Sequence, residues 1–190
     1  LADYAKHAGM GQKSGIDLPA EAAGIVPSPE WKLRTQRQKW FAGETISVSI
    51  GQGQVSVTPV SMAVYAATLA NGGLRVKPKL VLSRQRPGGA VEKTPTEAGE
   101  RVIKPETAIT MRQMMEGVVL HGTGKKAILR GYTSGGKTGS AQIYDFKAKA
   151  YTHTYNASFL GFAPVANPQI VIAVTLEGTT GGGSGFGGVV

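Results

Sequence analysis

Residues 134–142 concentrate side chains that can do chemistry, because a lysine, a threonine and two serines lie within one short run. Three kinds of site fit their spacing. From Gly131, the pattern Gly-x-x-x-x-Gly-Lys-Thr is that of a phosphate-binding loop. From Ser134, Ser-x-x-Lys on a helix would place a nucleophilic hydroxyl one turn from an amine. From Lys137, Lys-Thr-Gly on a strand would offer a cation and a hydroxyl to a carboxylate, with glycine admitting a substrate backbone.

A phosphate-binding loop requires a strand before it and a helix after it, so that helix-terminal amides can surround the phosphate. Residues 127–129 could form the strand, but residues 139–144 have no amphipathic helical pattern. Residues 170–177 imitate the acid-terminated strand that accompanies such loops, although apolar strands ending in glutamate are common. Nucleotide binding is therefore disfavoured and stays an alternative.

The Ser134 pattern conflicts with helix formation. Gly135 and Gly136 separate the serine from Lys137, and each glycine costs roughly 1 kcal/mol inside a helix. Lys137 also begins the Lys-Thr-Gly run, and one lysine cannot lie on a helix and a strand together. The sequence therefore predicts that residues 136–144 form a strand paired with residues 156–163, and that no helix begins at Thr138.

The elements before this strand follow from capping and periodicity. Residues 1–9 are expected to end a helix. Thr58 and Pro59 begin a helix that ends at residues 71–73, and Pro105 begins a second one. We expect loops or short strands elsewhere, namely a loop over residues 14–26, strands over 45–50 and 76–82, and an exposed loop or hairpin over 84–99.

Three strands are expected to close the chain, over residues 136–144, 156–164 and 169–176. The last two are joined by a short turn suited to an antiparallel hairpin. Residues 178–188 are rich in glycine and are expected to be flexible. Helices followed by consecutive antiparallel strands indicate an α+β fold, with an antiparallel sheet flanked by helices.

Amino-acid composition limits the kinds of protein and of site that this chain can form. A length of 190 residues with 41% hydrophobic residues suits one globular domain or a large part of one. Cysteine is absent, and the three histidines lie far apart, so neither a disulfide nor a metal site is expected. The longest apolar run is strand-sized, so no segment of the sequence spans a bilayer.

The net charge of +9 favours an anionic partner such as nucleic acid, a membrane surface or an acidic polymer. Residues 31–40 carry four cations between Trp31 and Trp40, which is a weak nucleic-acid signature. A solvated surface segment anchored by tryptophan is favoured over this interpretation. A basic module that binds nucleic acid or another anionic polymer therefore stays an alternative.

The order of several motifs resembles the class B penicillin-binding proteins. These motifs are Thr-Ile-Ser-Val-Ser-Ile-Gly-Gln-Gly at 45–53, Thr-Pro-Val-Ser-Met-Ala at 58–63, Leu-Ala-Asn-Gly-Gly at 69–73, Gly-Gly-Lys-Thr-Gly-Ser-Ala-Gln at 135–142, and Phe-Leu-Gly-Phe-Ala-Pro at 159–164. Gly-Ile-Asp-Leu-Pro at 15–19 and the segment 31–45 are most similar to the elongation-type, rod-shape transpeptidases. The resemblance covers nearly the whole chain.

This resemblance implies the penicillin-binding transpeptidase and serine β-lactamase fold, and a peptidoglycan D,D-transpeptidase that cross-links stem peptides through an acyl-serine. Lys137 would supply positive charge near the substrate carboxylate, and the hydroxyls of Thr138 and Ser140 would contact that carboxylate. The Ser140 N–H would be one oxyanion-hole donor. Gly139 would permit close approach, and Gln142 is a weaker substrate-binding candidate. No cofactor or metal is implied.

The family places its nucleophile Ser-x-x-Lys and its Ser-x-Asn motif before the region that corresponds to residue 1, and no Ser-x-Asn triplet occurs here. Residues 1–190 are therefore expected to be the C-terminal portion of a single transpeptidase domain, incomplete at both ends. The implied partners are D-Ala-D-Ala stem peptides, β-lactams, a glycan polymerase and cell-shape proteins, and not nucleic acid. The implied location is the outer side of the cytoplasmic membrane, with an upstream anchor.

Overall fold

A three-stranded antiparallel sheet with helices across one face organises the computed structural model, which describes residues 1–145, 147–148 and 150–180. The strands are β5 (Gly135–Asp145), β6 (Ala150–Ala163) and β7 (Ile170–Thr180), in the order β5-β6-β7. Lys137 pairs with Leu160 across β5 and β6, and the prediction of a strand without a helix at Thr138 is confirmed.

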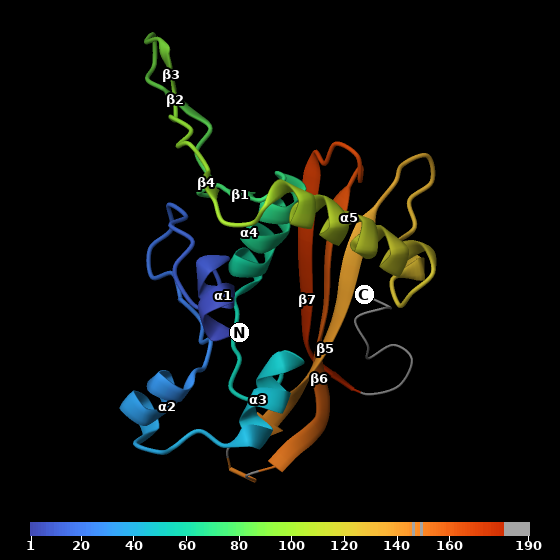
Figure 1. Ribbon diagram of the computed structural model, residues 1–190. Helices are drawn as coiled ribbons and strands as arrows, with labels where there is room; N and C mark the ends of the chain where they lie inside the picture. The colour runs from blue at the N-terminus through green and yellow to red at the C-terminus, as the bar shows by residue number, and fades with distance from the viewer. Residues whose placement is uncertain (146, 149, 181–190) are drawn as a thin grey trace.

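Two predicted helices lie across this sheet (Figure 1). They are α4 (Pro59–Ala70) and α5 (Pro105–Leu120), and both begin with proline as expected. The Thr58 hydroxyl accepts a 3.1 Å hydrogen bond from the Ser61 N–H, which caps α4. Six buried side chains join the helices to the sheet and form the core: Leu69, Val102, Ile103, Ala108, Met115 and Phe162.

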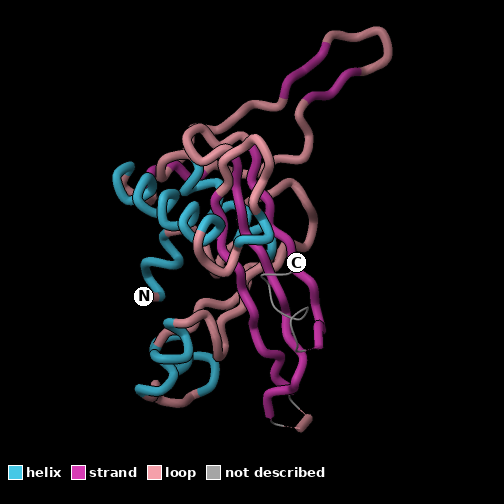
Figure 2. Tube along the Cα trace, turned by 90° about the vertical axis from the view of Figure 1, so that its right-hand side faces the viewer, coloured by secondary structure: helices cyan, strands magenta, loops and turns pink. Residues whose placement is uncertain are grey.

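Seen from the side, α4 and α5 lie against one face of the sheet (Figure 2). The other face carries an apolar stripe on β7, because alternate residues of a strand share a face. The side chains of this stripe are exposed, from 37% for Val174 to 60% for Ile170, with Ile172 and Leu176 between them. We call these four residues the β7 stripe.

The first part of the chain forms three short helices, namely α1 (Ala2–His7), α2 (Pro29–Gln36) and α3 (Ala42–Ser49). The expected strand over residues 45–50 was wrong, because α3 occupies most of that range. Ile46 and Ile50 are four residues apart and share a helix face as readily as a strand face. The Glu44 carboxylate accepts a hydrogen bond from the Phe41 N–H at 2.8 Å, and this cap favours the helix.

A hairpin arm projects from the top of the molecule (Figure 1). Strands β2 (Ser83–Gln85) and β3 (Val91–Lys93) pair within it, and β1 (Leu74–Arg75) pairs with β4 (Glu100–Arg101) at its base. The exposed hairpin expected over residues 84–99 is confirmed. The strand expected over residues 76–82 was wrong, because Pro78 lies within it and lacks the N–H that a ladder needs.

Two remaining expectations concern the bilayer and the chain end. No helix among the described residues is both long and apolar enough to cross a membrane. The glycine-rich run expected over residues 178–188 lies mostly outside the described residues, and its described part belongs to β7.

Candidate active-site strand

β5 lies at an edge of the sheet, and its register decides which backbone groups face that edge. The carbonyl oxygen of Gly135 lies between β5 and β6, 3.2 Å from where a Cβ on Gly161 would be. Hydrogen-bonded and non-hydrogen-bonded pairs alternate along an antiparallel ladder. The odd-numbered residues of β5 therefore bond to β6, and Thr138 and Ser140 direct their N–H and C=O groups toward the edge opposite β6.

Glycines let the strand lie close to its neighbours just before Lys137. A Cβ on Gly135 would lie 2.7 Å from the Phe162 ring and 3.2 Å from the backbone nitrogen of Glu116 in α5. A Cβ on Gly136 would collide with the Phe159 ring. Both phenyl rings thus occupy space that a side chain would need, and the glycine pair is required by packing.

Lys137 is an exposed cation that turns toward the edge of the sheet. It pairs with Leu160 in register while Thr138 pairs with Phe159, so the side chains of Lys137 and Thr138 leave opposite faces of β5. The Lys137 Nζ nevertheless donates a 2.7 Å hydrogen bond to the Thr138 carbonyl oxygen. The ammonium therefore lies beside the outward backbone groups of the strand.

Thr138 meets a residue that the sequence interpretation did not single out. Its Oγ1 lies 2.7 Å from the Oγ1 of Thr123, in the turn after α5. The N–H groups of Gly122 and Gly124 both donate to the Val118 carbonyl oxygen at 3.0 Å, which folds this turn back over the helix end. The two glycines flanking Thr123 were the available signal, since they mark a tight turn near a hydroxyl.

The structure places the other predicted residues of the strand as follows. Ser140 pairs in register with Ala157 and is partly buried. A Cβ at Gly139 would collide with the Ser158 hydroxyl, so this position is narrow on one face. The Gln142 side chain donates to the Thr152 carbonyl oxygen at 2.7 Å and is engaged within the β5–β6 hairpin.

The structure does not match the other two interpretations of residues 134–142, the helical Ser-x-x-Lys motif and the phosphate-binding loop. Ser134 precedes β5 outside any helix, and its hydroxyl donates to the Ala127 carbonyl oxygen at 3.2 Å. Ser134 and Lys137 are therefore not one helical turn apart. The segment from Thr138 continues β5, so the helix that a phosphate-binding loop needs is replaced by a strand.

The basic segment between the tryptophans is partly internal. Lys32 is only 4% exposed, and its Nζ lies 2.7 Å from both carboxylate oxygens of Glu44. The same Nζ is 4.8 Å from the centre of the Phe41 ring. The hydrogen bond from Lys32, with that from the Phe41 N–H, lowers the pKa of Glu44 below its usual value. Trp40 donates to the Thr45 hydroxyl at 2.8 Å. These contacts favour the anchored surface segment over a nucleic-acid site.

The residues that the structure describes hold no group of three or more His, Cys, Asp or Glu side chains able to bind a metal ion. β5 itself offers an ammonium, hydroxyls and backbone groups. An edge strand with these groups, beside helices on one face of an antiparallel sheet, has the form to which an extended peptide can add as a further strand.

Comparison with known proteins identifies the family of this chain. The family model described as the penicillin binding protein transpeptidase domain matches residues 1–188, and the chain belongs to this family. The α+β fold expected from the sequence is the fold of that family, as the solved structures below show.

Relatives among curated proteins match most or all of this chain. The peptidoglycan D,D-transpeptidase MrdA of Acinetobacter baumannii is 38% identical over 193 residues, covering 93% of this chain and 28% of the relative. The stage V sporulation protein D of Bacillus subtilis is 36% identical, covering 100% of this chain and 28% of the relative. The chain thus spans less than a third of the length of these relatives.

Solved structures of penicillin-binding proteins are similar to the structure of this chain. Penicillin binding protein 3 of Mycobacterium tuberculosis in complex with ampicillin has a TM-score of 0.81 at 33% identity, covering 93% of this chain and 39% of that one. A complex between penicillin-binding protein PBP2 and MreC from Helicobacter pylori has a TM-score of 0.75 at 28% identity, covering 93% of this chain and 31% of that one.

Proposed function

We propose that this chain forms the substrate-binding strand of a peptidoglycan D,D-transpeptidase. The observation that carries the proposal is the edge of β5, where the Lys137 ammonium lies 2.7 Å from the Thr138 carbonyl and the backbone of Ser140 faces the same edge. A peptide that adds to this edge gains backbone hydrogen bonds from β5, and its terminal carboxylate gains a cation and hydroxyls.

The roles follow from chemical type. Lys137 provides positive charge beside the substrate carboxylate, which the hydroxyls of Thr138 and Ser140 contact. The Ser140 N–H is an oxyanion-hole donor, and Gly139, which has no side chain, permits close approach of the substrate backbone. Gln142, held by Thr152, acts by supporting the strand more than by touching substrate.

The reaction has two steps. A serine hydroxyl attacks the carbonyl carbon of the penultimate D-Ala, the amide bond breaks, and the terminal D-Ala leaves with the proton. An amine of a neighbouring stem then attacks the acyl-serine ester, the new amide forms, and the serine recovers its proton. β-Lactams acylate the same serine. No step needs a cofactor or metal.

We further propose that residues 1–190 are the C-terminal portion of one transpeptidase domain and that the serine belongs to a part outside this chain. The β7 stripe supports this proposal, because a row of exposed branched apolar side chains on a sheet face is normally covered in a complete domain. Ser134, the one serine here at Ser-x-x-Lys spacing, is not on a helix.

The proposed partners and location follow from the relatives. The MrdA relatives carry the name of a peptidoglycan D,D-transpeptidase, and a structural neighbour was solved with MreC. We propose that the longer protein acts with a glycan polymerase and cell-shape proteins. It would be anchored in the cytoplasmic membrane by a segment outside this chain, with the domain on the outer side.

Labelling with a fluorescent penicillin tests the proposal. The 190-residue chain alone is expected to form no covalent adduct, whereas the longer protein with its upstream segment forms one on a serine of that segment. Circular dichroism of the short chain verifies that it is folded. Mass spectrometry that locates an adduct on Ser134 of the short chain would contradict the strand assignment, and a longer protein without any adduct would contradict the function.

A further inference from the structure

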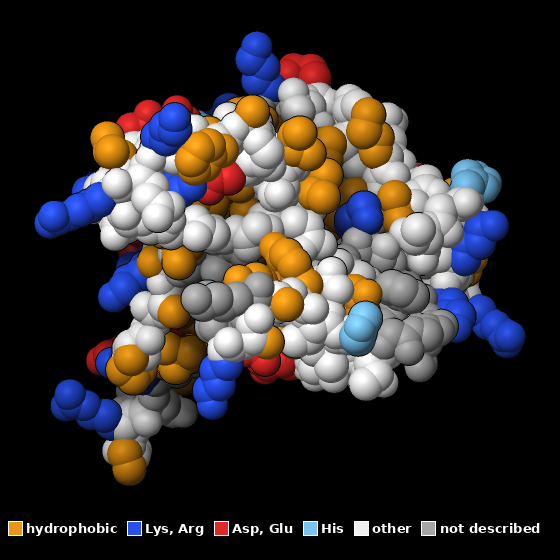
Figure 3. Space-filling model, turned by 90° about the horizontal axis from the view of Figure 1, so that it is seen from below, with side chains coloured by type: hydrophobic (Ala, Val, Ile, Leu, Met, Phe, Trp, Pro, Cys, Tyr) orange, Lys and Arg blue, Asp and Glu red, His pale blue; other side chains and the backbone are white. Residues whose placement is uncertain are grey.

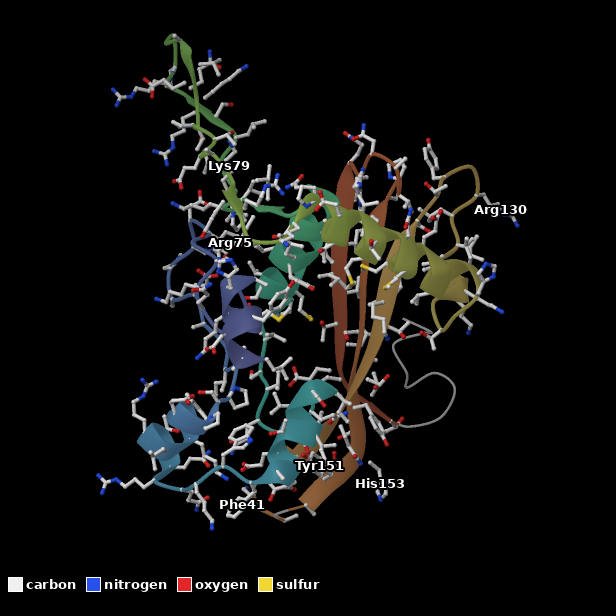
Figure 4. The ribbon with its side chains drawn as sticks, in the orientation of Figure 1. Phe41, Arg75, Lys79, Arg130, Tyr151 and His153 are labelled. Carbon is white, nitrogen blue, oxygen red and sulfur yellow. The ribbon has the colours of Figure 1, made fainter. Side chains whose placement is uncertain are left out.

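A cavity lies at the end of β5 and β6 that is remote from Lys137. Its volume is about 750 Å³, within the usual range of small-molecule sites. Two of its lining residues, Tyr144 of β5 and Tyr151 of β6, are paired in register. The rest come from α2, the loop before it and the loop after α3: Ile25, Trp31, Gln36, Gly53, Gln54, Val55 and Ser56. Figure 4 shows Tyr151 below α3, at the same end of the molecule as Phe41.

The cavity joins aromatic rings with amide and hydroxyl groups. The rings of Tyr144 and Tyr151 pack edge to face with centroids 5.2 Å apart, and 38% and 48% of these residues is exposed. Trp31 supplies a third ring, whereas Gln54 and Ser56 supply polar groups. Aromatic rings offer apolar faces with a partial negative charge, and an amide can both donate and accept hydrogen bonds.

This combination suits a sugar. A pyranose ring has an apolar face of C–H bonds that stacks on an aromatic ring, and its rim carries hydroxyls and N-acetyl groups that need donors and acceptors. No described Asp, Glu, Lys or Arg lines the cavity, so a neutral occupant fits it better than a charged one, which would find no ion-pair partner. Figure 3 looks onto this end and shows the basic side chains dispersed among hydrophobic ones.

The distance along β5 links the cavity to the proposed peptide site. Six residue steps from Thr138 to Tyr144 cover roughly 20 Å of strand. A stem pentapeptide that adds antiparallel to β5, with its carboxylate at Thr138, extends toward the C-terminal end of β5, and five extended residues reach roughly 17 Å. The other end of such a peptide, which carries its sugar, therefore arrives beside Tyr144.

We propose that the cavity lined by Trp31, Gln54, Tyr144 and Tyr151 binds the N-acetylated amino sugar to which the donor stem peptide is attached. This inference rests on the proposed function, because the peptide sets the direction of approach. The cavity would make the protein prefer stem peptides still joined to glycan over free peptides. It would bind the sugar during the acylation step, and the position of the reacting bond beside Ser140 would stay the same.

The test compares two donor substrates in the longer protein. One is a disaccharide-pentapeptide, and the other is the same pentapeptide capped by a lactyl group. The measured quantity is the ratio of their kcat/KM values for release of D-Ala. We expect the disaccharide substrate to be favoured by about tenfold or more, mainly through KM. Tyr151→Ala and Gln54→Ala, which change two different elements, should each lower this ratio by about fivefold.

The matched control is Tyr132→Ala, which removes a more exposed tyrosine, 69% exposed, that does not line the cavity and should keep the wild-type ratio. Tyr151→Phe keeps the ring and should retain most of the preference. Equal kcat/KM for the two substrates in the wild type would overturn the sugar site, as would variants that keep the wild-type ratio.

Penicillin acylation of the wild type separates this inference from the proposed function. Acylation with no sugar preference overturns the cavity assignment alone. Absence of acylation and of turnover in the longer protein overturns the proposed function on which the inference rests. Thermal melting of each variant identifies one that has lost its fold, and Gln54→Ala, in an exposed loop, then decides the outcome.

Discussion

The groups proposed to bind substrate are few and close together. Lys137 and Thr138 are adjacent in the sequence, yet their side chains leave opposite faces of β5, and only the turn of the Lys137 side chain toward the Thr138 carbonyl brings the ammonium to the edge. The hydroxyl of Thr123, in the turn after α5, lies against the hydroxyl of Thr138. At the scale of residues, the site is therefore assembled from the strand edge and one glycine-flanked turn.

Replacing Lys137 tests its proposed role. Lys137→Ala in the longer protein should slow acylation by a β-lactam by at least about tenfold, because a charge-assisted hydrogen bond to the ligand carboxylate is lost. Lys125→Ala, in the nearby 3-10 turn η1 (Lys125–Ala127), should change the rate little, because exposed charges act through screened fields. The second-order acylation rate at fixed ionic strength is the measurement. Equal rates for Lys137→Ala and the wild type would remove this lysine from the site.

Thr123 is expected to act as a positioning residue for Thr138. Thr123→Val keeps the shape but removes the 2.7 Å partner of the Thr138 hydroxyl. Loss of one hydrogen bond of about 1 kcal/mol should raise KM for peptide donors by roughly fivefold and change kcat less. Thr123→Ser, which restores a hydroxyl, should recover most of the loss. Steady-state kinetics that find Val and Ser variants indistinguishable would argue for a packing role only.

Elements meet in this structure at glycines that close approach requires. Gly73 ends the loop after α4 with a φ of +92°, and a Cβ there would collide with the carbonyl of Ile103. This contact ties the end of α4 to the segment that leads into α5, because the N–H groups of Val102 and Ile103 both donate to the Gly73 carbonyl. The placement of both helices on the sheet depends on this junction.

A pair of glycine substitutions tests the junction. Gly73→Ala should destabilise the protein by about 2–4 kcal/mol, because it combines an unfavourable φ with a backbone collision. Gly117→Ala in α5 meets nothing within 4 Å and should stabilise by about 0.5–1 kcal/mol through helix propensity. Denaturant unfolding of the two variants measures the difference. Similar unfolding free energies for both would show that the junction tolerates a side chain.

In the whole molecule, a buried ion pair and an exposed apolar surface lie in two different regions. The lower end holds the buried Lys32, paired with Glu44, while the β7 stripe leaves apolar side chains exposed on the sheet. Lys32, one of the four cations of the segment between the tryptophans, is buried and neutralised by Glu44, so it adds no charge to a surface that could bind an anion. The basic composition by itself does not mark a nucleic-acid site.

The Lys32–Glu44 pair predicts a pH dependence of stability. Because the pKa of Glu44 is lower in the folded protein than its usual value near 4.5, the carboxylate stabilises the fold above that value. This contribution is lost as the pH falls from about 4.5 through the lower folded pKa. Glu44→Gln should lower the melting temperature at neutral pH and flatten this acid limb, because Lys32 stays buried without its partner.

Thermal melting between neutral and acidic pH measures this effect. The control is Glu177→Gln, which changes an exposed carboxylate on β7 and should follow the wild-type curve. A Glu44→Gln variant that loses stability on acidification as steeply as the wild type would show that the pair does not set the acid limb.

The α+β class, the β5–β6–β7 order of strands, the proline-initiated helices and the family were all predicted correctly from the amino-acid sequence. Local signals carry each of these: Pro59 and Pro105 at helix starts, alternation along residues 156–176, and the Lys-Thr-Gly run beginning at Lys137. The strand predicted over residues 45–50 was wrong, because the spacing of Ile46 and Ile50 fits both a strand and a helix. The cap that Glu44 provides favours the helix.

The contacts between residues far apart in the sequence became known only from the folded structure. The contact of Thr123 with Thr138, the burial of Lys32 against Glu44, and the cavity that joins Trp31 to Tyr151 all link segments that local patterns cannot relate. Register decided that the backbones of Thr138 and Ser140 face the sheet edge, since a shift of one residue would turn them toward β6. The physical reason is that pairing and packing depend on chain segments far apart in the sequence.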